Sequence, residues 1–267
     1  MKRVALFLLL FTLLAPGFVV AEEDKPDVPL TPEEMAAFSD NMLIPSPGEL
    51  FSAMDKMGEV DWSAAANYTN RSRYDNDYLR AMNLGTRAAD AFIALQAQDK
   101  VSFGEMVSVI FNLAGELGVS ESIIQRGEAI KELVKQDQWD QIRPELEQVK
   151  DLIQQELEAM DDTESATMLS AAGWIEGLRS VCVILSEDYT PEASSLLYQR
   201  QLVDFFADQF AAMTPEAQDQ AQVKAIAEAL AEIKALVDVG PGNPISEESV
   251  ARLLEISTEL VAQIEEG

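Results

Sequence analysis

The charged side chains best placed to do chemistry lie in two stretches that are otherwise apolar. Residues 76–98 and residues 164–187 are rich in Leu, Ile, Ala and Met, yet each carries an arginine and an acid. A helix that is apolar on nearly every side is expected at the centre of a fold. A charge on such a helix must be paired, because an isolated buried ion costs several kcal/mol. The resulting hypothesis is one polar centre formed by Arg87, Asp90, Glu176 and Arg179.

Three interpretations of these charges remain open from the sequence. They form a neutral network that fixes the register of two core helices, they reach solvent at the helix edges, or they bind a ligand. Both stretches contain Gly-x-Arg, at Gly85 and Gly177, and glycine allows another backbone to approach closely. The candidate ligand-binding residues are Asn83, Arg87, Asp90, Trp174, Glu176 and Arg179, although the indole of Trp174 also suits the core.

Aromatic residues gather in the polar stretch between residues 59 and 78, ahead of the first apolar helix. This stretch contains Trp62, Tyr68 and Tyr74 among asparagines and arginines, unlike the acidic segments elsewhere. Long polar loops with aromatic side chains suit recognition, but the same composition suits a lid packed over the helices. Trp62, Tyr68 and Tyr74 are the candidate partner-binding residues if the stretch is a recognition surface.

Composition excludes most catalytic and metal-binding arrangements. The chain has no histidine, so it lacks the usual general base and the usual metal-ligating nitrogen. Its single cysteine, Cys182, has apolar neighbours, which predict a buried small side chain rather than a nucleophile. The acidic runs at 75–77 and 161–164 lack the spacing of a calcium-binding loop. We therefore expect no metal, no cofactor and no catalytic residue of these kinds.

The chain is strongly acidic, with 47 acidic against 19 basic residues and a net charge of −28. A nucleic-acid partner is not expected, because binding to a phosphate backbone needs a basic surface. Anionic lipid headgroups are disfavoured for the same reason. The acidity either keeps the helix faces solvated or attracts a cationic partner.

The first 21 residues have the pattern of a secretory signal peptide. Lys2 and Arg3 precede an apolar run that ends in small residues at Ala21, and acidic residues follow at once. We predict cleavage after Ala21, no transmembrane segment after cleavage, and a periplasmic or secreted location. Residues 22–45 are predicted as an extended, proline-containing arm, and residues 46–267 as a single all-helical domain.

Helical signals dominate from residue 46 onward. Three Ser/Thr-Pro pairs, beginning at residues 46, 190 and 214, combine a hydroxyl that caps free amides with a proline suited to the first turn. Ser102 and Glu105 have the spacing of a capping box. Elsewhere apolar residues recur at spacings of three and four, without strand-like alternation. The predicted helices span 48–58, 76–98, 102–117, 120–135, 138–161, 164–187, 191–211, 215–238 and 246–265.

These elements predict an all-α fold, an irregular bundle of about eight or nine helices, with an α-solenoid-like array as the alternative. Two functions fit such an exported helical protein. The first is a non-enzymatic protein that binds a protein partner or a small ligand, and the missing histidine and nucleophile favour it. The second is a carboxylate-dependent hydrolase or lyase that acts on cell-wall glycans. A carboxyl group in a cleft with its pKa raised towards neutrality would favour the enzyme.

Overall fold

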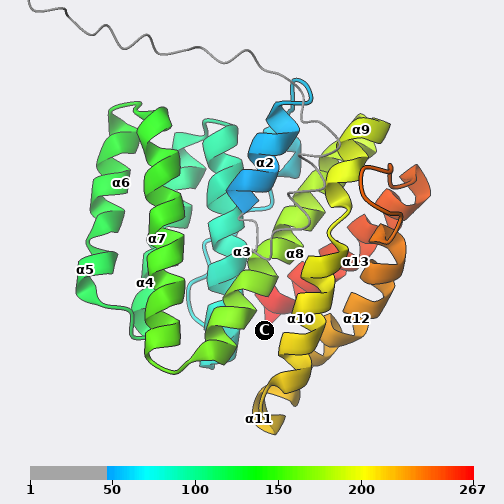
Figure 1. Cartoon of the computed structure of the whole chain (residues 1–267). Helices are drawn as coiled ribbons and strands as arrows, with labels where there is room; N and C mark the ends of the chain where they lie inside the picture. The colour runs from blue at the N-terminus through cyan, green and yellow to red at the C-terminus, as the bar shows by residue number, and fades with distance from the viewer. Residues whose placement is uncertain (1–46) are drawn as a thin grey trace, which may run out of the picture.

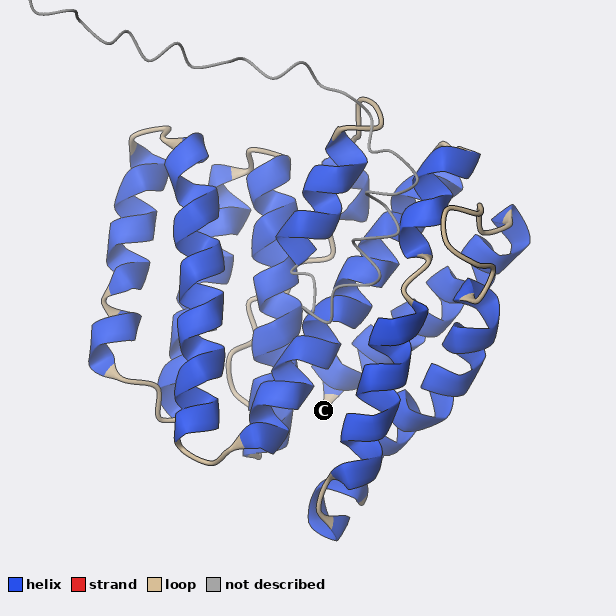
Figure 2. Ribbon diagram, in the orientation of Figure 1, coloured by secondary structure: helices blue, strands red, loops and turns tan. Residues whose placement is uncertain are grey.

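The computed structural model describes residues 47–267, and the regular structure in that range is entirely helical (Figures 1 and 2). The all-α prediction is confirmed, since no strand occurs among these residues. The predicted signal peptide, the predicted arm and the cap at residue 46 lie outside the described residues. The helices are α2 (Pro47–Asp55), η1 (Trp62–Ala65), α3 (Asp77–Gln96), α4 (Lys100–Glu116), α5 (Glu121–Ile124), α6 (Arg126–Lys135), α7 (Trp139–Ala159), α8 (Thr163–Glu187), α9 (Pro191–Ser194), η2 (Ser195–Leu197), α10 (Arg200–Ala212), α11 (Pro215–Gln218), α12 (Ala221–Val237) and α13 (Glu247–Glu266).

The centre of the fold is the packed pair α3 and α8, the two apolar helices singled out by the sequence. They cross at Gly85 and Gly173, where a Cβ atom built on Gly173 would lie 3.1 Å from the carbonyl oxygen of Gly85. Two glycines let the backbones touch, which brings every side chain near the crossing into close contact. In the described part of the chain, α8 is also the one helix long and apolar enough to span a membrane, but 89% of its most apolar window is buried in the protein.

The other helices pack around this central pair. Figure 1 shows α4 to α7 on one side of α3 and α8, and α9 to α12 on the other. Neighbours in sequence pack together, as in α3 with α4 and α12 with α13, but the most extensive packing joins α3 to α8 across the four intervening helices. In a solenoid each repeat contacts only its neighbours. The arrangement is therefore a multi-helix bundle.

Three of the predicted helices are interrupted in the structure. The predicted spans 120–135 and 215–238 each divide into a single helical turn and a longer helix, and the span 191–211 divides into α9, η2 and α10. Thr190 and Thr214 do cap, accepting hydrogen bonds from the amides of Ala193 and Ala217. The turns that they start end early, because the chain must reverse direction there to pack against α8 and α10.

One predicted start was wrong. Helix α4, predicted to span 102–117, begins at Lys100 because Asp99 is its cap. The Asp99 carboxylate accepts hydrogen bonds from the amides of Val101 and Ser102, both at 3.1 Å. The Ser102 hydroxyl also donates to this carboxylate, and that bond, followed by the two amide bonds, lowers the pKa of Asp99. An acid at this position satisfies free amides and also faces the positive end of the helix.

Candidate functional site

Two charged residues of α8 form a buried ion pair at the centre of the fold. Arg179 Nε lies 3.0 and 2.9 Å from the two carboxylate oxygens of Glu176, which is one turn earlier on the same helix. Ser180 adds a hydrogen bond from its hydroxyl to Glu176 Oε1 at 3.2 Å. Burial raises the pKa of Glu176, and the hydrogen bond and charge of Arg179 oppose that rise. These charge-assisted hydrogen bonds hold the ion pair together and give the Glu176 carboxylate its hydrogen-bond donors.

Arg87 is the buried arginine of α3, and its guanidinium makes ion pairs and hydrogen bonds with several groups. Its guanidinium lies 3.1 Å from the carboxylate of Asp90 and makes a close ion pair with Glu265 near the end of α13. It also donates to the main-chain carbonyl of Thr69 at 3.1 Å. One arginine therefore joins α3, α13 and the loop before α3.

Asp90 is the least satisfied charged group in this cluster. Its side chain is fully buried, and neither carboxylate oxygen accepts a hydrogen bond, although Oδ2 lies 3.1 Å from Arg87 Nη1. Burial raises the pKa of Asp90 well above its usual value, and the charges of Glu176 and Glu265 raise it further, while Arg87 lowers it. Asp90 therefore favours its protonated, neutral form far more than an exposed aspartate does.

The predicted polar centre divides into a connected part and one outlier. Arg87 and Asp90 on α3 form one ion pair, Glu176 and Arg179 on α8 form another, and the two arginines donate to carbonyls four residues apart in the segment before α3, those of Thr69 and Ala65. Asn83 lies one turn before Arg87 and donates to the carbonyl of Ile264 in α13 at 2.8 Å. The indole of Trp174 instead donates to Gln199 Oε1 at 2.6 Å and stacks near Phe206, so it belongs to the core beside α10.

The aromatic loop lies over this centre and will be called the strap (residues 59–76). Trp62 packs on Phe51 with ring centroids 4.7 Å apart, and both Trp62 and Tyr74 are only 4% exposed. Tyr68 is half-buried, and its hydroxyl is enclosed. Trp62 and Tyr74 therefore anchor the strap to the helices and present little surface to a partner, whereas Tyr68 is partly exposed.

The sequence did not single out Glu265 or the strap carbonyls, yet both complete the cluster. Arg179 donates to the carbonyl of Ala65 at 2.7 Å, as Arg87 does to that of Thr69. Glu265 is one of 47 acidic residues, and nothing in its neighbourhood in sequence marks it as a partner of Arg87. Cys182 is buried as expected, and that burial raises the pKa of its thiol.

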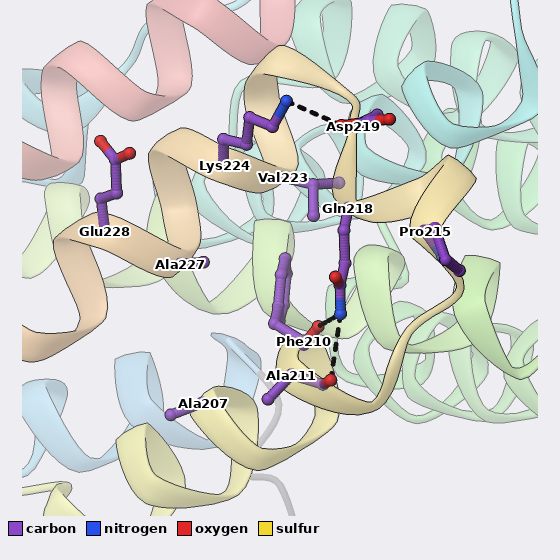
Figure 3. Close-up of a pocket in the computed structure, with 10 residues that line it drawn as sticks. All are labelled: Ala207, Phe210, Ala211, Pro215, Gln218, Asp219, Val223, Lys224, Ala227 and Glu228. Carbon is purple, nitrogen blue, oxygen red and sulfur yellow. Dashed lines mark hydrogen bonds and ion pairs between the residues drawn. The ribbon is translucent and has the colours of Figure 1, made fainter.

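A second feature of the surface is a groove between α10 and α12 that α11 closes at one end (Figure 3). It has a volume of about 710 Å³, and Phe210 and Val223 are its buried floor. Gln218 closes the end of α10 by donating to the carbonyls of Phe210 and Ala211 at 3.3 and 3.0 Å. The groove exists because small residues line its walls, namely Ala207, Ala211 and Ala227.

Neither feature resembles a metal centre, and within residues 47–267 no cluster of acids and cysteine has a geometry that holds a metal ion. Comparison with protein families, curated proteins and solved structures finds no match for this chain.

Proposed function

We propose that this chain is an exported, non-enzymatic binding protein that holds an apolar, positively charged helix of a partner protein in the groove between α10 and α12. The observation that carries the proposal is the groove itself, with its volume of about 710 Å³ and its apolar floor. Ligand sites in proteins have volumes of about 300–1,000 Å³ and combine apolar walls with a few polar groups.

The shape of the groove suits the face of a helix. Ala207 and Ala211 are one turn apart on α10, and Ala227 faces them from α12, so that large side chains of a partner find room between the two helices. An amphipathic helix places its apolar residues at intervals of three and four, which matches such a groove. Phe210 and Val223 supply apolar contact at the bottom of the groove.

The charge of the surroundings favours a cationic partner. Residues 200–238 contain seven acidic and three basic residues, a net charge of −4, in a chain whose total is −28. Glu228 lies on the rim of the groove, and Asp219 is held there by Lys224 at 2.9 Å. Opposite charge accelerates association and fixes orientation, whereas affinity comes from the apolar contacts.

The buried acids support binding over catalysis. Asp90 and Glu176 have raised pKa values, as a catalytic acid would, but they are 0% and 1% exposed and are covered by the strap. A glycan chain must reach a catalytic carboxyl within hydrogen-bond distance. These two carboxyls therefore do not favour the alternative of a hydrolase or lyase that acts on cell-wall glycans.

Export is proposed from the pattern of residues 1–21 alone, a basic start followed by an apolar run and small residues. N-terminal sequencing of the protein from its own cells should give Glu22 as the first residue. Recovery of intact Met1 from the membrane fraction would contradict this part of the proposal.

The groove is tested with a synthetic peptide of Leu and Lys that forms an amphipathic helix, labelled for fluorescence anisotropy. Ala227→Arg fills the groove, and Ala231→Arg adds the same charge one turn further along α12, outside the groove. Binding is expected to fall at least tenfold in Ala227→Arg and to change less than threefold in Ala231→Arg. Affinity should weaken as salt rises, because exposed charges are screened beyond about 8 Å at physiological salt.

Two controls separate recognition by the groove from general charge attraction. A peptide of the same composition without an apolar face should bind at least tenfold more weakly, and a Leu and Glu helix should not bind. Equal binding of the two basic peptides, or equal loss in the two variants, would contradict the proposal.

A further inference from the structure

The strap is held over the centre of the fold in two different ways. Its ends are anchored by buried aromatic side chains, Trp62 and Tyr74. Its middle, residues 66–73, has no regular structure and is held by polar contacts: Arg87 donates to the carbonyl of Thr69, and Arg71 donates to the carbonyls of Glu265 and Glu266. Arg179 donates to Ala65, the last residue of η1, where the middle segment begins. A polar ligand can replace hydrogen bonds of this kind. It cannot replace the apolar contacts of the buried aromatic side chains.

Hydrogen bonding beneath the strap is incomplete. Among residues 47–267, every buried side-chain polar atom without a hydrogen bond belongs to the strap or to α3. Native proteins satisfy nearly all such groups, with protein partners, water or a ligand. On α3 these residues follow one another at intervals of four and three and so share one face. The unsatisfied atoms are the hydroxyls of Tyr68 and Tyr74, Asn83 Oδ1, Arg87 Nε and both carboxylate oxygens of Asp90.

The charges in this cluster do not balance when all three acids are ionised. Arg87 and Arg179 supply two positive charges, whereas ionised Asp90, Glu176 and Glu265 would supply three negative charges. Glu176 takes the hydrogen bonds of Arg179 and Ser180, and Glu265 is paired with Arg87 and partly exposed. The uncompensated charge therefore falls on Asp90, which is fully buried and accepts no hydrogen bond.

We propose that the strap covers a binding site for a small organic cation, whose ammonium group pairs with the carboxylate of Asp90 between α3 and the strap. Tyr68 comes directly before Thr69, whose carbonyl oxygen lies 3.1 Å from the same Nη1 atom of Arg87 that lies 3.1 Å from Asp90 Oδ2. The unsatisfied carboxylate and hydroxyl oxygens lack hydrogen-bond donors. An ammonium group can donate up to three hydrogen bonds to them. Aromatic side chains beside a carboxylate are a common setting for such cations.

Access to this site requires movement of the strap, since Asp90 has no exposed surface. Outward movement of residues 66–73 releases the contact of Thr69 with Arg87 and those of Arg71 with the carbonyls of Glu265 and Glu266, while Trp62 and Tyr74 stay in place as hinges. This site is separate from the groove between α10 and α12 and goes beyond the binding function proposed above.

The test is calorimetric titration of the whole protein at neutral pH with butylamine, ethanolamine and 1,4-diaminobutane as probes. The uncharged analogue 1-butanol is the matched control ligand. Binding of at least one amine, and not of butanol, is expected. The titration is repeated in two buffers of different ionisation enthalpy, because burial raises the pKa of Asp90 and an ammonium group should displace the proton that this favours.

Variants locate the site. Asp90→Asn keeps the shape of the side chain and should weaken amine binding at least tenfold and abolish proton release. Glu187→Gln removes an exposed acid from the end of α8 and should change neither. Equal binding by the Asp90→Asn variant, binding of butanol as strong as that of the amines, or no binding of any amine would overturn the proposal and leave water to satisfy these atoms. Ala227→Arg in the groove should not affect the amines, so the two proposals fail independently.

Discussion

Glu176 is the residue on which the central ion pair depends. Its carboxylate holds Arg179, and Arg179 in turn holds the carbonyl of Ala65 in the strap. Glu176→Ala is expected to lower the free energy of unfolding by about 3 kcal/mol, because it leaves a buried guanidinium without its counter-charge. Denaturant unfolding measures this loss.

Glu187→Ala is the matched control, since this acid lies on the same helix and is exposed. Exposed acids contribute at most about 1 kcal/mol, so little change is expected there. A loss below about 0.5 kcal/mol in Glu176→Ala would mean that the ion pair contributes no more than a surface pair.

Ionisation of Asp90 lowers the stability of the folded protein as the pH rises. Its pKa is raised above the usual 3.8, so the folded protein retains a proton that the unfolded chain releases. The stability that this proton contributes is fully present below pH 3.8 and is lost as the pH rises through the folded-state pKa. Asp90→Asn remains neutral throughout, and Arg87 keeps Glu265 as a partner.

Asp90→Asn should therefore exceed the parent chain in stability at about pH 8 and match it at about pH 4. Thermal unfolding across this range gives the measurement. A difference in melting temperature that does not grow with pH would show that the Asp90 carboxyl ionises as easily in the folded protein as in the unfolded one.

At the scale of the helices, the contact between α3 and α8 depends on glycine. A Cβ atom at Gly85 would overlap the main-chain carbonyl of Leu169, whereas a Cβ atom at Gly104 meets no heavy atom within 4 Å. Gly85→Ala must push the two helices apart and is expected to cost about 3 kcal/mol. Gly104→Ala, in the second turn of α4, should instead stabilise the protein by about 0.5–1 kcal/mol.

Denaturant unfolding of these two variants separates the close helix contact from the general effect of glycine in a helix. If both variants gained stability, the close approach of the two backbones at Gly85 would be refuted.

The sequence predicted the long helices well because their signals are local. Apolar spacing and hydroxyl caps act within a few residues, and α3, α7, α8 and α13 agree with the predicted spans within two residues at each end. The breaks after α5, α9 and α11 were missed, because they depend on where the chain must turn to pack against distant helices. The cap at Asp99 was missed because Ser102 offers a competing signal in sequence.

The candidate site was predictable where burial forces charges to pair, and not elsewhere. Arg87, Asp90, Glu176 and Arg179 stood out because charges are rare on apolar helices. Their further partners are main-chain carbonyls of the strap and an acid of α13, and only tertiary contact identifies these. The groove had no sequence signal, since alanines on a helix surface are common.

At the scale of the whole molecule, the net charge of −28 opposes compaction. Like charges repel more strongly in the folded protein, where they are closer together, and salt screens that repulsion. The melting temperature is therefore expected to rise by several degrees between about 10 mM and 500 mM sodium chloride. Sucrose solutions of equal osmolality serve as the comparison, because they add no ions. A melting temperature that fell with salt would show that the ion pairs outweigh the repulsion.

The contact between α3 and α8 also limits when the centre of the fold can form during synthesis. α3 leaves the ribosome long before α8, and residues 97–162 are made in between. Until then the apolar face of α3 and its charged residues have no partner, and contacts between such distant segments form late in folding. Helix α3 is therefore most prone to aggregation while α4 to α7 are being made. This interval is the period in which a chaperone is most needed.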